Sequence, residues 1–316
     1  MVPESYNTNP INLNVNNVPA NYGRVLISGG YHREGETEIF DFSQGTSVDG
    51  PVMKQQRFGH ASVALYSGDV ALFGGRVDYN DSRKEYTCSC EVFSVNSLSF
   101  YEVGYMHKQR QNPAAVLLNN GVVFIVGGCR DRETFDCCEL YTHYRQDFVL
   151  SAAKMKTPRV YHTASLLPDG RVLVCGGYPS ITCYGSNQAL QLNTTEIYDW
   201  TTDSFSDGPL MNEKRAEHTA NTLPNGKVII AGGNPVTSST STEIYDPATN
   251  SFSAGPTMTI GRSGHCSASL PDGKVFIVGG FGASDHATEV YDPATNTFSV
   301  GPELSDKRRF ASATAF

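Results

Sequence analysis

The sequence lacks the features of membrane, exported and nucleic-acid-binding proteins. It has no window of about eighteen apolar residues, and its start, MVPESYNTNPINLNVNN, carries neither the basic residues nor the apolar run of a signal peptide. A net charge of -8 provides no basic field to attract nucleic acid or an anionic membrane. We therefore expect a cytoplasmic protein. The sequons at Asn80 and Asn193 would instead fit a secreted protein from which a leader had been removed.

Tryptophan and charged residues are also scarce, with one Trp and 18% Asp, Glu, Lys and Arg. The chain is rich in the residues of strands and tight turns, with 30 glycines, 16 prolines, 16 Phe and 16 Tyr. This composition favours an all-β fold.

A double glycine at the end of a short apolar run recurs six times. The second glycines are 45, 53, 49, 56 and 47 residues apart, a period typical of a propeller blade. The pairs are Gly29-Gly30, Gly74-Gly75, Gly127-Gly128, Gly176-Gly177, Gly232-Gly233 and Gly279-Gly280.

Three further landmarks recur with the double glycine. A glutamate opens an apolar and aromatic run, a turn such as Asp246-Pro247-Ala248-Thr249-Asn250 follows, and an arginine precedes the next repeat, often with a histidine three residues later. The glutamates are Glu38, Glu91, Glu139, Glu196, Glu243 and Glu289, and the arginines are taken as Arg57, Arg110, Arg159, Arg215, Arg262 and Arg309. Four short strands per repeat cannot bury their own faces, so we predict that the repeats stack radially into a closed ring.

These units resemble kelch repeats, in particular those of the central domain of galactose oxidase, with their Glu-x-Tyr-Asp-Pro-x-Thr and Pro-Asp-Gly-Lys-Val-x-x-x-Gly-Gly signatures. The resemblance implies a six-bladed β-propeller over residues 23–316, preceded by an N-terminal extension over residues 1–22. The last residues, Phe310 to Phe316, align with the strand that opens every other blade, so we expect them to complete the first blade. Ile11, Leu13 and Val15 alternate like a competing strand.

The repeat separates scaffold from site, because a residue present in every blade serves the blade rather than one ligand. The six arginines and six glutamates are therefore interpreted as buried ion pairs. The histidines His60, His162, His218 and His265 are interpreted as scaffold residues for the same reason.

The candidate site lies in the loops after the double glycine, which are longest in blades 2 to 4, because function in propellers resides in unequal loops on a rigid scaffold. Their mixture of Arg, Tyr and charge is typical of a surface that binds protein. A merely solvated rim is the alternative interpretation. The candidate partner-binding residues are Arg76, Asp78, Tyr79, Arg83, Lys84, Arg130, Arg132, Tyr178 and Tyr184.

No catalytic residue, metal site or cofactor is predicted. Cys88-Ser-Cys90 and Cys137-Cys138 lack the spacing of a zinc site. Cys129 and Cys137 flank a hairpin that a disulfide could bridge, although reduced thiols packed beside strands are the simpler interpretation. Galactose oxidase needs copper held by two Tyr and two His with a stacking Trp, a set that this sequence does not offer.

The sequence therefore favours a monomeric binding scaffold for a protein or peptide partner, within a cytoskeletal or adaptor assembly as the kelch resemblance implies. The alternative is a carbohydrate-active enzyme or lectin that uses the central funnel.

Overall fold

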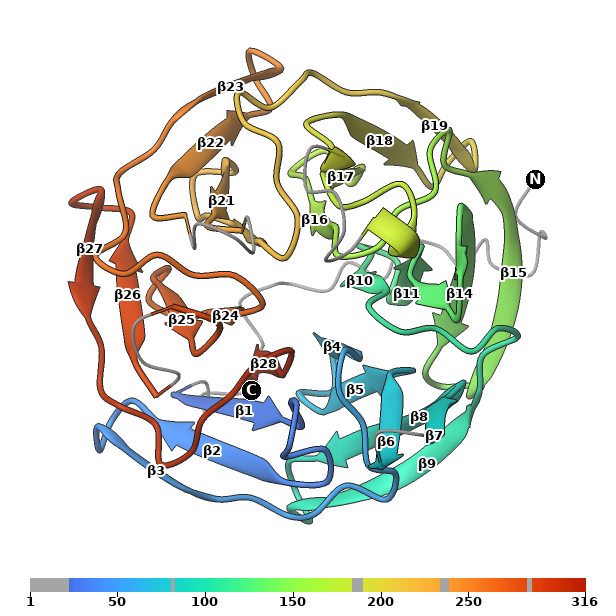
Figure 1. The fold of residues 1–316 in the computed structure, drawn as a ribbon, viewed down its shortest axis with the longest axis vertical. Helices are drawn as coiled ribbons and strands as arrows, with labels where there is room; N and C mark the ends of the chain where they lie inside the picture. The colour runs from blue at the N-terminus through green and yellow to red at the C-terminus, as the bar shows by residue number, and fades with distance from the viewer. Residues whose placement is uncertain (1–22, 81–82, 184–189, 234–238, 283–285) are drawn as a thin grey trace.

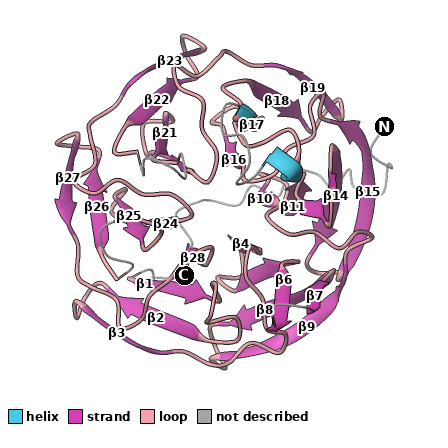
Figure 2. Cartoon of the chain, in the orientation of Figure 1, coloured by secondary structure: helices cyan, strands magenta, loops and turns pink. Residues whose placement is uncertain are grey.

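The structure is a computed structural model that describes residues 23–80, 83–183, 190–233, 239–282 and 286–316. Six four-stranded antiparallel sheets surround a central axis (Figure 1), which confirms the six-bladed, all-β propeller. In the described residues, helical structure is limited to short 3₁₀ turns such as η3 (Ile181–Cys183; Figure 2), and no helix there is long and apolar enough to cross a membrane. The expected extension over residues 1–22 lies outside the described residues.

Each blade runs from an inner strand at the axis to an outer strand at the rim. Blade 1 is β28 (Ser312–Ala315), β1 (Arg24–Ser28), β2 (Thr37–Asp41) and β3 (Thr46–Asp49); blade 2 is β4 (Ala61–Ala64), β5 (Val70–Phe73), β8 (Ser89–Ser94) and β9 (Ser99–Tyr105); blade 3 is β10 (Ala114–Leu117), β11 (Val122–Val126), β14 (Cys137–Thr142) and β15 (Asp147–Lys154). Blade 4 is β16 (Thr163–Leu166), β17 (Val172–Cys175), β18 (Thr195–Asp199) and β19 (Ser204–Asp207); blade 5 is β20 (Thr219–Thr222), β21 (Val228–Ala231), β22 (Thr242–Asp246) and β23 (Ser251–Ala254); blade 6 is β24 (Cys266–Ser269), β25 (Val275–Val278), β26 (Thr288–Asp292) and β27 (Thr297–Val300).

The C-terminal strand closes the ring. β28 pairs with β1 in antiparallel register from Val25 opposite Ala315 to Ser28 opposite Ser312, so blade 1 takes three strands from the start of the described chain and one from its end. The expected closure by the C-terminal strand is confirmed.

The core lies between the blades. The second strand of each blade is a run of apolar residues buried on both faces, and the apolar clusters join residues of adjacent sheets. At the blade 3–4 boundary, for example, the rings of Phe124 and Tyr198 stack at 4.0 Å. A single blade therefore cannot be stable without its neighbours.

Each blade carries one buried arginine paired with the glutamate of its own third strand, as the repeat predicted. The Arg57 and Glu91 side chains are fully buried, and Arg57 Nη2 lies 2.6 Å from Glu91 Oε1. The guanidinium also donates to the carbonyl oxygens of Gly74 and Ser89, and the carboxylate accepts the backbone N–H groups of Lys54 and Gln55. The ion pair thus ties the linker from the preceding blade to two strands.

The sixth arginine is Arg308, so the prediction of Arg309 was wrong. Arg308 is buried, lies 3.8 Å from Glu38 and donates to the carbonyl oxygen of Gly29, whereas the Arg309 guanidinium lies over the Phe281 ring at 4.3 Å. The error arose because Ala311 occupies the position of the repeated histidine, so no landmark distinguished the two consecutive arginines.

The double glycine is required by the following blade. At Gly176, φ is +62°, and a Cβ would overlap the carbonyl oxygen of Arg215 and approach His218 Cε1 to 2.9 Å. The N–H of Gly177 donates to the same Arg215 carbonyl at 2.8 Å. The arginine of one blade therefore rests on the glycine pair of the blade before it.

We expect Gly176→Ala to lower the free energy of unfolding by about 2–5 kcal/mol, because it adds a steric clash to a left-handed backbone. Gly45→Ala is the matched control: its φ is +65°, but nothing lies within 4 Å of the added carbon, so it should cost only about 1–2 kcal/mol. Urea unfolding measures both, and equal losses would contradict the role assigned to the blade contact.

Candidate interaction face and channel mouth

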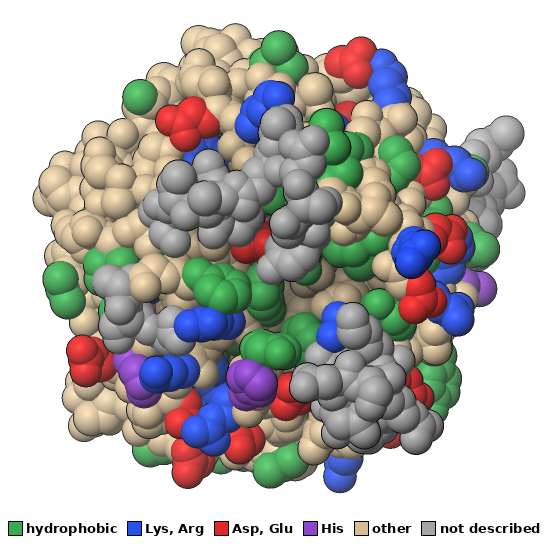
Figure 3. Space-filling model, in the orientation of Figure 1, with side chains coloured by type: hydrophobic (Ala, Val, Ile, Leu, Met, Phe, Trp, Pro, Cys, Tyr) green, Lys and Arg blue, Asp and Glu red, His purple; other side chains and the backbone are tan. Residues whose placement is uncertain are grey.

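The long loops and the central channel open on one face of the ring. In four blades the residue after the buried arginine forms a β-bridge with the residue after the double glycine, as in Phe58 with Arg76 and Val160 with Tyr178. The loops that enter the inner strands therefore lie beside the variable loops. On this face hydrophobic side chains gather around the central hollow, with basic and histidine side chains beside it (Figure 3).

Two of the three predicted loops form hairpins. β6 (Arg76–Asn80) pairs with β7 (Arg83–Tyr86) in blade 2, which places the backbone of Asp78, Tyr79, Arg83 and Lys84 in that hairpin. In blade 3, β12 (Cys129–Arg130) pairs with β13 (Glu133–Thr134).

The predicted side chains fall into different environments. The Arg76 guanidinium lies 5.2 Å from the centre of the Phe58 ring. Arg130 and Arg132 are exposed, and Arg130 lies 3.5 Å from Asp131. Tyr184 lies outside the described residues. The blade 3 hairpin therefore offers exposed charge of both signs.

Tyr178 does not contribute to an exposed surface, which corrects the sequence interpretation. Its exposed fraction is 0%, and its hydroxyl accepts a hydrogen bond from Gln191 at 3.1 Å. It packs with Cys129, Val160, Cys183 and Ala216 beneath the loops of blades 3 and 4. Tyr178 therefore supports these loops from below.

The sequence interpretation missed the residues at the channel mouth, which lie two positions after the buried arginine of each blade. All six have φ between +50° and +62°, a conformation that glycine adopts freely, that Asn tolerates, and that strains most other residues. Backbone hydrogen bonds link five of the six neighbouring pairs around the ring, from 2.6 to 3.0 Å. These residues are Gly59, Asn112, Tyr161, Glu217, Gly264 and Phe310.

Strain at these positions singles out three side chains. Two blades use the glycine that the conformation favours and one uses Asn112, which adopts it more readily than most residues, whereas Tyr161, Glu217 and Phe310 adopt it at a cost of about 1–2 kcal/mol each. Strained residues of this kind cluster at functional sites. Aligning the repeats at the arginine would have shown the variability of this position, but not its backbone conformation.

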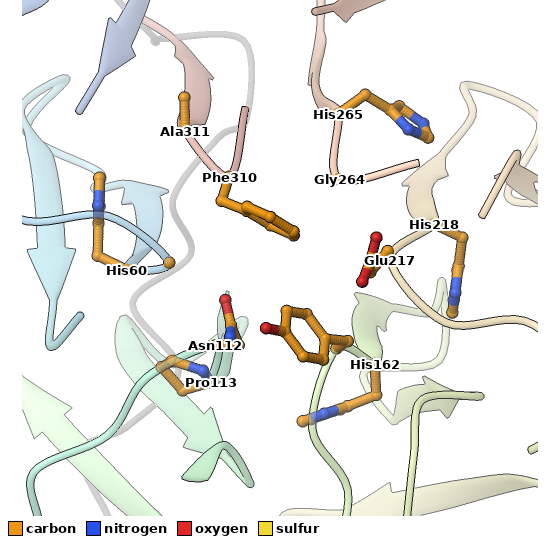
Figure 4. Close-up of a pocket in the computed structure, with 12 residues that line it drawn as sticks. His60, Asn112, Pro113, His162, Glu217, His218, Gly264, His265, Phe310 and Ala311 are labelled. Carbon is orange, nitrogen blue, oxygen red and sulfur yellow. The ribbon is translucent and has the colours of Figure 1, made fainter. Parts of the chain in front are cut away.

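The channel mouth holds a small cavity. Its volume is about 160 Å³, close to the space that a benzene-sized group fills. Figure 4 shows Asn112, Glu217 and Phe310 pointing into this space. The rings of Tyr161 and Phe310 are half-buried, with centroids 5.7 Å apart, and Phe310 lies 5.7 Å from Phe281. The mouth can thus accept one side chain of a partner against aromatic rings.

Beneath the mouth, histidines join neighbouring blades. His218 Nε2 lies 3.0 Å from the Thr163 hydroxyl of the preceding blade, and His265 lies 3.1 Å from Thr219. His60 lies 2.8 Å from Ser312. At the boundary between blades 3 and 4, Ala114 occupies the position of these hydroxyl-bearing residues. Neither ring nitrogen of His162 has a partner with hydrogen-bond geometry among the described residues. The scaffold role predicted for the histidines is confirmed, with one pair incomplete.

Completing that pair should stabilise the ring. We expect Ala114→Ser to raise the free energy of unfolding by about 0.5–1.5 kcal/mol, because the hydroxyl would pair with His162. Ala61→Ser is the control: Ala61 begins the inner strand of blade 2 as Ala114 begins that of blade 3, but the next blade has Pro113, which offers no imidazole, at the histidine position. Chemical unfolding compares the two variants, and a gain shared by both would contradict the assignment.

Acid should weaken the ring through these histidines. Burial, assisted by a nearby arginine, lowers the pKa of His60, His162 and His265 to about 3, and it lowers that of His218 as well. The unfolded chain binds these protons near pH 6.5 and the folded chain does not, so stability is lost as the pH falls below about 6.5.

Each histidine should contribute a loss of up to about 2 kcal/mol by pH 5. His162→Leu should remove one such contribution, so the stability difference between pH 7.5 and pH 5 should be smaller in the variant than in the wild type. Urea unfolding at both pH values measures it. An unchanged difference would show that the fold does not lower the pKa of His162.

The eight cysteines are free thiols. Burial raises the pKa of Cys129 and Cys266 to about 12, which makes these thiols unreactive. Cys137 Sγ accepts from Arg110 Nη2 at 3.2 Å, in the place that a Ser or Thr hydroxyl takes in blades 2, 4 and 5. No group of three or more His, Cys, Asp or Glu side chains that could hold a metal ion occurs among the described residues.

Two known proteins are similar to this chain. A solved structure of a novel fungal alcohol oxidase of the AA5 family, in complex with copper, matches 92% of this chain and 65% of its own with a TM-score of 0.63; at 17% identity it shows the fold alone. Kelch repeat-containing protein kel-10 of Caenorhabditis elegans is 27% identical over 113 residues, which are 35% of this chain and 18% of that protein. The matched regions thus span less than two thirds of the alcohol oxidase chain and of kel-10.

Family models give a more extensive match. The KLHDC2/KLHL20/DRC7 Kelch-repeats domain matches residues 59–280, and the Kelch motif matches residues 262–305. The first match covers more than half of the sequence and five of the six double glycines. The chain therefore belongs to the Kelch-repeat family.

Proposed function

We propose that this chain is a protein-interaction module that holds a segment of its partner across the channel mouth, flanked by the loops of blades 2 to 4. Kelch-repeat proteins commonly mediate protein–protein interactions. The observation that carries the proposal is the set of strained, non-repeated side chains at the mouth, with the aromatic pair Tyr161 and Phe310 beside a cavity that fits one side chain. Aromatic anchors next to a pocket are typical of binding hot spots.

The charged residues of the two hairpins favour partner binding on the same face as the channel mouth. Arg130 and Arg132 are exposed on the blade 3 hairpin, and arginine is over-represented at the centre of protein interfaces. The blade 2 hairpin brings Arg83 and Lys84 to this face through its backbone. We propose that these four residues contact the partner around the segment held at the mouth.

Affinity capture tests this site. Wild-type protein is compared with a variant in which Arg83, Lys84, Arg130 and Arg132 are changed to Ala. The matched control removes four basic residues from the turns on the opposite face: Arg145, Arg171, Lys227 and Lys274. We expect one protein to be retained by the wild type and the control and lost by the first variant.

A partner retained equally by all three would exclude the hairpin site. A glycan array with the same proteins tests the alternative use of the funnel. Binding of a sugar that Tyr161→Gly abolishes, without any captured protein, would replace the proposed function by carbohydrate binding.

A further inference from the structure

The histidine of blade 4 lacks the partner that its counterparts have. At three other blade boundaries a histidine Nε2 lies 2.8–3.1 Å from a Ser or Thr hydroxyl of the preceding blade. At the boundary between blades 3 and 4, Ala114 takes the place of the hydroxyl-bearing residue, and neither His162 nitrogen has a partner with hydrogen-bond geometry among the described residues. His162 is only 6% exposed. Because a buried polar group normally has a partner, His162 has a hydrogen bond to offer a ligand.

His162 borders the cavity at the channel mouth (Figure 4). The cavity measures about 160 Å³, and the twelve residues that line it all belong to the described part of the chain. His60, His218 and His265 also line it, but each of them already bonds a hydroxyl through Nε2. Among these four imidazoles, the one with both nitrogens unpaired is therefore that of His162.

The chemistry of His162 favours an uncharged hydroxyl. Burial, assisted by the charge of Arg159, lowers the pKa of His162 to about 3, so the imidazole is neutral at pH 7, with one nitrogen that donates and one that accepts. A hydroxyl both donates and accepts, so it pairs with either tautomer. A neutral imidazole has no charge with which to attract a carboxylate or a phosphate. The matching group is therefore the one that Ser312, Thr163 and Thr219 provide at the other boundaries.

The walls of the cavity favour an aromatic ring. The volume is close to that of a site that holds benzene, and Tyr161 and Phe310, with ring centroids 5.7 Å apart, line it. A third ring can join them in the offset or edge-to-face contacts of aromatic pairs. A Ser or Thr side chain would fill only part of this volume, whereas the phenol of a tyrosine combines a ring with a hydroxyl.

We propose that the mouth cavity binds a tyrosine side chain of the partner, whose hydroxyl pairs with His162 in place of the hydroxyl that Ala114 lacks. A tyrosine hydroxyl usually has a hydrogen-bond partner when it is buried, and His162 provides one. This inference rests on the proposed function for the source of the tyrosine, but not for the existence of the phenol site.

The site is tested with p-cresol, which is the tyrosine side chain as a free molecule, and with toluene, its counterpart without the hydroxyl. Nuclear magnetic resonance of the histidine ring nitrogens follows both titrations. We expect p-cresol to bind about five- to tenfold more tightly than toluene, as one hydrogen bond would give, and to shift the His162 signals more than those of His218. Equal binding of the two molecules, or p-cresol binding that leaves the His162 signals in place, would overturn the site.

Ala114→Ser separates the hydrogen bond from the shape of the cavity. Its hydroxyl would pair with His162, so p-cresol should lose its advantage and bind within about twofold of toluene. The matched control, Ala61→Ser, should keep the wild-type preference, because the histidine position of the next blade holds Pro113. Since Ala114→Ser should also stabilise the ring, a damaged fold would not explain the loss. A full preference for p-cresol in Ala114→Ser would overturn the assignment to His162.

The competing ligand is n-butylamine, the side chain of lysine, because Glu217 also lines the cavity. We expect the amine to bind more weakly than p-cresol, since an ammonium group accepts no hydrogen bond and brings no ring to Tyr161 and Phe310. Tighter binding of the amine than of p-cresol would overturn the proposal in favour of a basic side chain.

The captured partner tests the source of the tyrosine. Changing the tyrosine of its bound segment to Phe should weaken binding to the wild-type protein about five- to tenfold, and binding to Ala114→Ser by less than about twofold. If no Tyr-to-Phe variant of the partner binds more weakly while the wild-type cavity still prefers p-cresol to toluene, the partner does not use the site and the inference is overturned. Capture of the partner, and with it the proposed function, would be unaffected by that result.

Discussion

Changing Glu243 to Ala should lower the free energy of unfolding by about 3–5 kcal/mol, because it leaves a buried guanidinium without its counter-charge. Arg215 and Glu243 side chains are 1% and 3% exposed, with Nε and Oε1 3.0 Å apart. Glu243 also accepts the backbone N–H groups of Asn212 and Glu213 at 2.7 and 3.1 Å. The variant therefore loses an ion pair and two anchors of the linker at once.

The same arginine supplies the control. Glu213 also lies 3.2 Å from Arg215, but its side chain is 55% exposed, so Glu213→Ala should cost less than about 1 kcal/mol. Thermal and chemical unfolding of the two variants give the comparison. Equal losses would mean that the buried pair contributes no more than a surface contact.

Removal of residues 312–316 should have an effect of at least similar size. The deletion takes away β28, its ladder with β1 and the buried ring of Phe316, which lies 5.3 Å from Phe93. Loss of a buried Phe alone costs about 3–5 kcal/mol, and the opened ring also exposes the edge of β1 and the side of β4 that packs against β28. We expect a broad unfolding transition at lower temperature in calorimetry.

A circular permutant separates ring closure from chain length. Joining Phe316 to Arg24 through a Pro-Asp-Gly turn, as at Pro168-Asp169-Gly170, and opening the chain before Asp306 makes blade 1 continuous. Phe316 N already donates to the Arg24 carbonyl at 3.0 Å, so a short turn can span the gap. The permutant should unfold at a temperature near that of the wild type. A truncated chain as stable as the permutant would show that β28 is dispensable.

The scaffold was predictable because it repeats. Six glycine pairs about fifty residues apart, each followed by a glutamate, identified the blades, and the unpaired final strand predicted the closure. The prediction failed at the sixth arginine, where Ala311 replaces the histidine that would have fixed the register. One missing landmark was enough to shift the assignment by a residue.

The candidate site was only partly predictable, because its residues are defined by conformation and burial. Tyr178 looks like a surface aromatic in sequence, yet packing beneath the loops buries it completely. Tyr161 and Phe310 gave no sequence signal, since their side chains are unremarkable until the left-handed backbone places them at the channel mouth. His32 and Arg309 are 277 positions apart in the chain, and only ring closure brings both to the lining of one cavity between blades 1 and 6.

Changing Tyr161 and Phe310 together to Gly tests the central claim, that residues departing from the repeat at the mouth serve binding rather than the fold. Glycine is the residue that Gly59 and Gly264 place at this position, so the exchange relieves backbone strain. The measurement is the affinity for the captured partner alongside the free energy of unfolding. The account predicts at least about tenfold weaker binding with stability unchanged or higher. Unchanged affinity with reduced stability would contradict it.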